Sequence, residues 1–244
     1  MLTDSFNGAL TLGIAHKSMK KILLTSAIFT GLLTGLVANT FSVSSVNGGA
    51  ATGSTKLNFD DLTLGNATQW ADANVQVSFA GSGKVVQGAS SGVYAAPFVS
   101  GSNGLGFLAP DQPTGVDTTN YLSTGVGSVT LQFSSSQDYF GLLWGSVDNY
   151  NTLSFYDGST LVGSFTGTQI WANANGNQGQ QGTFYVNFNS LDGSFNKVVA
   201  SSTQNAFELD NVAYNSKSVP DSGATLALMG VAFTGLISLR RKLR

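Results

Sequence analysis

The chain has 244 residues, no cysteine, one histidine and 10% charged residues, with a formal net charge of −2. The absence of cysteine excludes disulfide bonds and thiolate chemistry. Residues 51–217 contain four lysines, no arginine and eleven acidic side chains, a net charge of −7 that disfavours binding to nucleic acid or to anionic lipid.

The N-terminal region predicts a secretory signal peptide. A basic segment opens at Met19, residues 22–38 are largely apolar and helix-compatible, and small residues follow. Cleavage after Ala38 fits this pattern, and so does a cut further along, as far as Ala50. Residues 1–18 do not suit such a leader, so we interpret them as an N-terminal extension ahead of the true start.

Residues 51–217 consist of short apolar–polar runs separated by Gly, Asn, Asp and Ser, which is the pattern of an all-β domain. About ten short strands in one domain predict an antiparallel two-sheet sandwich, jelly-roll-like, between the N-terminal signal helix and a C-terminal transmembrane helix. The strands are expected at Lys56–Phe59, Val75–Phe79, Lys84–Gln87, Val93–Val99, Val129–Phe133, Phe140–Trp144, Thr152–Tyr156, Ser159–Phe165, Phe184–Phe188, Lys197–Ser201 and Ala206–Tyr214.

Several local features of this sandwich are also expected. Asp157-Gly158 supplies the positive φ of a type I′ hairpin turn, and Trp144 lies in an apolar run typical of a buried strand. Residues 105–119 and the Asn/Gln/Gly-rich residues 173–182 read as long loops.

The last expected strand changes phase. Phe207 and Leu209 fall on one parity, whereas Val212 and Tyr214 fall on the other. A β-bulge near Asp210-Asn211 would bring both pairs to the same face.

Catalytic groups are scarce. Without cysteine, and with His16 confined to the N-terminal extension, Ser-His-Asp and Cys-His arrangements are excluded. Glycoside hydrolysis needs two carboxyls, and the only glutamate, Glu208, shares a face with Asp210 if the bulge lies beyond both. The alternative is a polar strand face, and we expect no enzymatic activity.

A hard cation is the one cofactor that the residues suggest. Asp60, Asp61 and Asp210 would meet if the first and last strands were neighbours, and Ca²⁺ prefers such oxygen ligands. The alternative is that the Asp60-Asp61 pair caps a strand or turn.

Exposed aromatic rings are the expected means of binding sugar. Trp171, beside the loop of residues 173–182, is the first candidate, and Trp70 and Tyr150 are weaker ones. The alternative is that these side chains belong to the core of the sandwich.

The C-terminal residues 218–244 predict a sorting signal. A polar motif precedes the apolar residues 224–239, which as a helix span roughly 24 Å, close to the thickness of a bilayer core. The basic end should stay cytoplasmic. The alternative is a buried helix of a soluble domain. The motif is Val219, Pro220, Asp221, Ser222 and Gly223, and the basic end is Arg240, Arg241, Lys242 and Arg244.

This tail resembles the VPDSG variant of the PEP-CTERM class of exosortase sorting signals. The resemblance implies recognition and cleavage by a membrane-embedded exosortase after transient membrane insertion, with loss of the apolar tail. It further implies delivery of the mature protein to the cell surface or the exopolysaccharide matrix. The predicted partners are the Sec translocon, exosortase and exopolysaccharide.

The body contains three short blocks, at residues 57–62, 140–146 and 207–212. Together they resemble a family of exosortase-dependent surface proteins with a carbohydrate-module-like sandwich. We therefore expect an exported structural protein of the surface or matrix, and alternatively a carbohydrate-binding module that holds exopolysaccharide. The expected organisation is an extension (1–18), a signal peptide and linker (19–50), a sandwich domain (51–217) and a sorting signal (218–244).

Overall fold

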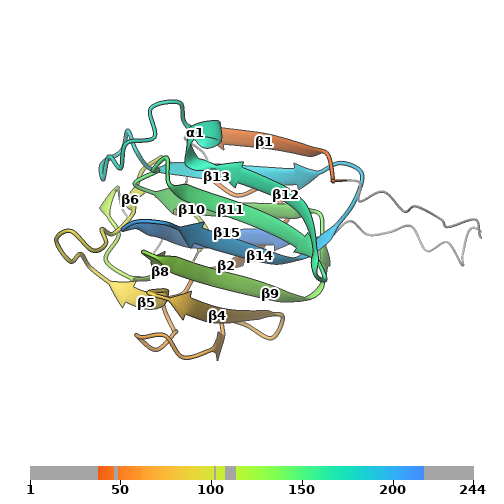
Figure 1. The fold of residues 1–244 in the computed structure, drawn as a ribbon, viewed down its shortest axis with the longest axis horizontal. Helices are drawn as coiled ribbons and strands as arrows, with labels where there is room; N and C mark the ends of the chain where they lie inside the picture. The colour runs from red at the N-terminus through yellow and green to blue at the C-terminus, as the bar shows by residue number, and fades with distance from the viewer. Residues whose placement is uncertain (1–37, 47–48, 102, 108–113, 217–244) are drawn as a thin grey trace, which may run out of the picture. The chain divides into compact units, whose positions relative to one another are not determined.

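A computed structural model describes residues 38–216, apart from residues 47–48, 102 and 108–113 (Figure 1). The predicted signal helix and the whole C-terminal sorting signal lie outside these described residues. Within the described part of the chain, no helix is both long enough and apolar enough to cross a membrane.

The domain is built from two antiparallel β-sheets that face each other (Figure 1). The first has seven strands, in the order β1-β13-β10-β15-β8-β5, with β2 also paired to β15; the second has six, in the order β12-β11-β14-β9-β4-β3. The all-β antiparallel sandwich is therefore confirmed. The first sheet comprises β1 (Phe41–Val46), β2 (Thr55–Leu57), β5 (Lys84–Gln87), β8 (Asn120–Thr124), β10 (Tyr139–Gly145), β13 (Phe184–Ser190) and β15 (Phe207–Asn215).

The second sheet and the remaining elements complete the fold. It comprises β3 (Gln69–Trp70), β4 (Val75–Gly81), β9 (Gly127–Gln137), β11 (Asn151–Asp157), β12 (Thr160–Thr166) and β14 (Phe195–Ser202). A two-stranded ladder joins β6 (Phe98–Val99) and β7 (Gly115–Val116), and a single helical turn, α1 (Gly167–Ile170), follows β12.

An aromatic core fills the space between the two sheets. Phe155 from the second sheet packs on Phe188 of the first, with ring centroids 5.1 Å apart. Trp144 is fully buried and stacks on Phe207 at 4.3 Å, as expected of a core residue. Because alternate residues of a strand point to opposite faces, the inward positions of β10 and β15 build this core and their outward positions remain for other contacts.

The predicted bulge in the last strand is present. Gly141 pairs with Ala213, but Leu143 pairs with Asp210, so β15 has one extra residue between these two pairs. Asn211 takes the extra position with a φ of 49°, a left-handed conformation that asparagine tolerates better than most residues. Phe207, Leu209, Val212 and Tyr214 consequently all reach the inter-sheet core.

The hairpin of β11 and β12 is present, with a different turn from the one expected. Asp157 pairs with Thr160, which leaves Gly158 and Ser159 as the turn. Only Gly158 has a positive φ, 58°, so the turn has the glycine-first pattern of type II′ and not the expected type I′.

Three segments depart from the expected strands. Of Val93–Val99 only the last two residues form a strand, because Pro97 lacks an N–H and its neighbours instead pack on the outer face of the first sheet. β8 was not expected, because it is covered on both faces and its residues therefore do not alternate between buried and exposed. β1 pairs with β13 along its whole length, so the sheet begins at Phe41, ahead of the expected domain start at residue 51.

Residues 88–101, 103–107 and 114–119 form a covering segment over part of the outer face of the first sheet. Val99 and Phe107 pack there on the outward side chains Leu143, Tyr185 and Ala213, in a second small core. The outward positions of β15 are therefore buried as well, and this places its acidic side chains beneath a covering segment.

Candidate functional site

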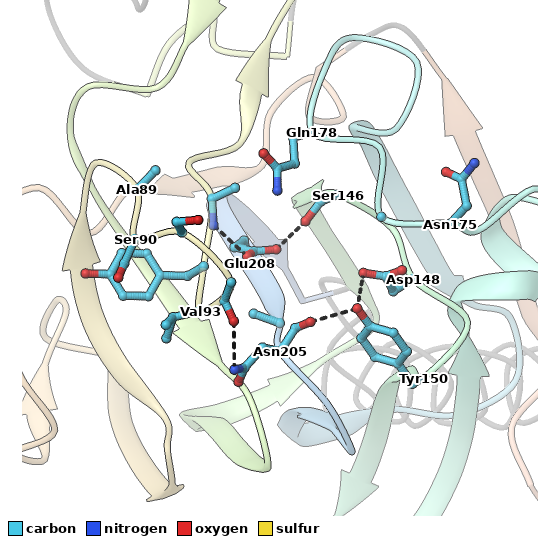
Figure 2. Close-up of a pocket in the computed structure, with 16 residues that line it drawn as sticks. Ala89, Ser90, Val93, Ser146, Asp148, Tyr150, Asn175, Gln178, Asn205 and Glu208 are labelled. Carbon is cyan, nitrogen blue, oxygen red and sulfur yellow. Dashed lines mark hydrogen bonds between the residues drawn. The ribbon is translucent and has the colours of Figure 1, made fainter.

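An open cavity of about 460 Å³ lies where several loops meet beside β15 (Figure 2). The 89–95 segment forms one wall, and Asp148 and Tyr150 of the β10–β11 loop form another (Figure 2). Asn175 and Gln178 come from the loop after α1, and Asn205 comes from the β14–β15 loop. Most of these groups are amides, hydroxyls and carboxyls, and the described residues that line the cavity include no lysine or arginine.

Glu208 supplies the buried acid of this cavity. Its carboxyl accepts hydrogen bonds from the Ser146 hydroxyl and, at 2.9 Å, from the Ala95 backbone N–H. Burial raises the pKa of Glu208 to about 7, these two bonds oppose the shift, and the negative charge of Asp148 adds to it. Ser146 has a φ of 36°, a conformation that serine rarely adopts, and it places the hydroxyl against Glu208.

Asp148 and Tyr150 form the second polar pair. The Tyr150 hydroxyl lies 2.6 Å from Asp148 Oδ2 and 2.7 Å from the Asn205 carbonyl oxygen (Figure 2). Burial raises the pKa of Asp148, and the Tyr150 bond opposes the shift. A side chain at Gly176 would approach Asp148 Oδ2 to 2.7 Å, so glycine is what lets the 173–182 loop lie so close.

The arrangement favours binding over catalysis by the expected acid pair. Glu208 and Asp210 do share the outer face of β15, because the bulge lies beyond both. The carboxylate whose charge acts on Glu208 is nevertheless Asp148, whereas Asp210 belongs to a separate cluster. Sequence reasoning missed Asp148 and Ser146, since only the folded chain brings their loop to β15.

The second cluster contains Asp210, Asp60 and Asp117, all on the side of the first sheet that residues 88–119 cover. Asp210 and Asp117 lie within hydrogen-bonding reach of each other, and the charge of Asp60 acts on Asp210. The structure thus brings together two of the three expected cation ligands, Asp60 and Asp210. Asp61 is exposed, and Asp117 is the carboxyl that sequence reasoning missed.

The three aromatic residues expected to bind sugar do not form one site. Tyr150 lines the cavity described above. Trp171 is half-buried, packs on Phe184 at 5.5 Å, and borders a separate hollow with Gln180 and Gln181. Trp70 is 59% exposed on β3, at the edge of the second sheet.

The fold and its cavity define an all-β sandwich domain with an acidic, amide-rich recess, and the chain continues beyond this domain into a sorting signal. Residues 218–243 match the family model of the VPDSG-CTERM motif, so the sorting signal recognised in the sequence is confirmed. This motif implies export and surface association, with processing by an exosortase, and it indicates no enzymatic family.

Similarity to curated proteins and to solved structures gives no further information about function. No curated protein matches the chain. Among solved structures, a carbohydrate binding module (CBM6cm-2) of Cellvibrio mixtus lichenase 5A, determined with cellotriose, matches at 12% identity and a TM-score of 0.28, over 67% of this chain and 97% of that one. A TM-score this low carries no argument about ligand or activity.

Proposed function

We propose that this chain is an exported, jelly-roll-like surface or matrix protein that an exosortase cuts at residues 219–223. The match of residues 218–243 to the sorting motif carries this proposal. Pro220 disfavours helix in the residue before it, and we expect this to leave the motif accessible to a protease at the membrane face. The apolar residues 224–239 and the basic end, Arg240 to Arg244, hold the precursor in the membrane after Sec-dependent export.

Mass spectrometry of the surface fraction tests this function. In cells that carry the exosortase, the wild-type protein should end near Gly223, whereas Pro220→Ala and Asp221→Asn should keep the tail. Thr234→Ala, inside the apolar run, is the matched control and should be processed normally. A normal mature C-terminus in both motif variants would refute the assignment.

A second function, binding of matrix polysaccharide, is favoured by the cavity at Glu208 and Asp148. Its size suits one or two sugar rings, and its amides, hydroxyls and carboxyls match the hydrogen-bonding groups of sugars. Tyr150 offers an aromatic ring at the wall. Because the charged side chains there are acidic, we propose a neutral or amino-sugar polysaccharide and not one rich in uronic acid.

A glycan array tests this second function. Tyr150→Ala should weaken binding roughly tenfold or more, since it removes the ring and a hydrogen bond to Asp148. Trp171→Ala tests the separate hollow at Gln180 and Gln181, and Trp70→Ala tests the exposed ring on β3. Leu161→Ala, at an exposed position of β12, serves as the control. The proposed sugar binding would be contradicted if the wild type bound no neutral or amino-sugar polysaccharide, or if Tyr150→Ala and Trp171→Ala both bound as the wild type does.

A further inference from the structure

The least expected group in the structure is the carboxyl of Asp210. The side chain is fully buried, and neither of its oxygens has a partner in good hydrogen-bond geometry, although the Asn211 backbone N–H lies close enough to lower its pKa. An ionised carboxylate without partners in a protein interior is very unfavourable, so something outside the described contacts must compensate it.

The neighbours of Asp210 make an ionised carboxylate there still less favourable. Asp117, 2% exposed, lies within hydrogen-bonding reach, and the negative charges of Asp117 and Asp60 both act on Asp210. Burial and these charges raise the pKa of Asp210 well above its ordinary value; the Asn211 N–H opposes the shift, and no positive side chain among the described residues does. Asp60 also has one buried oxygen, Oδ1, that accepts no hydrogen bond.

Since no positive side chain among the described residues acts on Asp210, a proton or a cation from solution would neutralise its charge. With both carboxyls ionised, Asp117 and Asp210 repel each other and neither can donate a hydrogen bond. A proton shared between them would compensate one charge and leave the other Asp210 oxygen without a partner. A cation with several coordination positions would engage both carboxylates and the free oxygen of Asp60.

We propose that Asp117 and Asp210 bind a divalent cation of the Ca²⁺ type, with Asp60 contributing its charge and its buried oxygen. In the part of the chain that the structure describes, no three acidic, histidine or cysteine side chains stand close enough to form a ready cage. Calcium does not require one, because it accepts six to eight oxygens at flexible distances, including backbone carbonyls and water.

The position of the cluster gives the cation a structural role. Asp60 follows β2, Asp117 follows β7, and Asp210 lies in β15 beside the bulge. The cation therefore fastens the covering segment, at its described residues 114–119, to the outer face of the first sheet. This inference does not depend on glycan binding or on C-terminal processing.

Thermal unfolding and calorimetry of the mature exported protein test the proposal. Addition of CaCl₂ to EDTA-treated protein should give a saturable heat of binding. At a hundredfold excess over Kd, it should raise the melting temperature by roughly 5–10 °C. Asp210→Asn and Asp117→Asn should each abolish both effects. In EDTA, Asp210→Asn should be more stable than the wild type, because it removes a repelling charge.

Two controls carry the same change of charge outside the cluster. Asp61→Asn alters the exposed neighbour of Asp60, and Asp157→Asn alters an exposed hairpin residue; both should keep the full response to calcium. A wild-type protein that gains neither heat nor stability from CaCl₂ would overturn the proposal in favour of a shared proton. So would an undiminished calcium response in Asp210→Asn and Asp117→Asn. MgCl₂ is expected to stabilise the wild type less, because Mg²⁺ demands a stricter geometry.

Discussion

Replacing Phe41 with alanine is the most direct test of where the mature domain begins. Phe41 opens β1, and its ring lies 4.9 Å from Phe155, 5.4 Å from Phe165 and 6.3 Å from Phe195. It also covers Gly163, where a Cβ atom would come within 2.5 Å of the ring. β1 is thus attached to the sandwich by its side chain as well as by its ladder to β13.

The structure sets the expected size of the effect. Truncating a fully buried phenylalanine to alanine costs about 3–5 kcal/mol. Phe41 is only partly buried, so the cavity opens toward solvent and we expect a loss of about 2–3 kcal/mol in the free energy of unfolding. Urea denaturation of the mature protein measures this loss. Ser44→Ala, an exposed position on the same strand, should stay within about 0.5 kcal/mol of the wild type.

The same reasoning predicts the mature N-terminus. The Asn39 side chain donates hydrogen bonds to Ser190 Oγ at 3.0 Å and to the Ser194 carbonyl at 3.1 Å, and the Thr40 N–H donates to Asp192 at 2.7 Å. A cut after Ala38 keeps all of these contacts, whereas a cut near Ala50 removes β1. N-terminal sequencing should therefore begin at Asn39. A start at residue 51, together with an unchanged stability of Phe41→Ala, would refute the idea that β1 belongs to the mature domain.

Three further changes test the site and the core. Glu208, with its pKa raised from 4.5 to about 7, contributes stability that is complete below about pH 4.5 and is lost as the pH rises through 7. In EDTA the wild type should therefore lose about 3 kcal/mol relative to Glu208→Gln between pH 4.5 and 8 in urea denaturation, and parallel pH profiles would contradict this. Gly158→Ala should cost about 1 kcal/mol through its positive φ alone, since beyond its two chain neighbours no atom lies within 4 Å of the added Cβ; an unchanged urea midpoint would contradict the positive φ at this turn. Trp144→Ala should cost about 3–5 kcal/mol in the same assay, and a loss below about 1 kcal/mol would contradict its burial against Phe207.

The sequence predicts those parts of the fold whose signal is local. The phase change between Leu209 and Val212 is visible in the sequence, and the bulge at Asn211 follows from it. β5 is found at the predicted residues because its run is short and bounded by turn residues. β1 was hidden because its alternating Phe41–Val46 run directly follows an apolar leader, and nothing local separates strand from linker there.

The candidate sites depend on contacts between distant residues, which no local pattern reveals. Asp117 lies in a segment that was predicted to be a loop, and only the position of residues 114–119 on the first sheet brings it to Asp210. In the same way, the β10–β11 loop brings Asp148 close enough for its charge to act on Glu208, which lies 60 residues later in the chain. Asp60 and Asp210 were predictable as a pair, because β2, just before Asp60, pairs with β15.

The bulge in β15 ties both sites to one feature of the backbone. Glu208 and Asp210 precede the extra residue, Asn211, so both point away from the inter-sheet core while Phe207 and Leu209 point into it. Without the extra residue, Val212 and Tyr214 would leave the core as long as Phe207 and Leu209 stayed there. The strand therefore keeps its hydrophobic residues inside on both sides of the bulge, and its two acids outside, beneath residues 88–119. That cover turns an otherwise solvated polar strand face into a recess at Glu208 and a closed carboxylate cluster at Asp210.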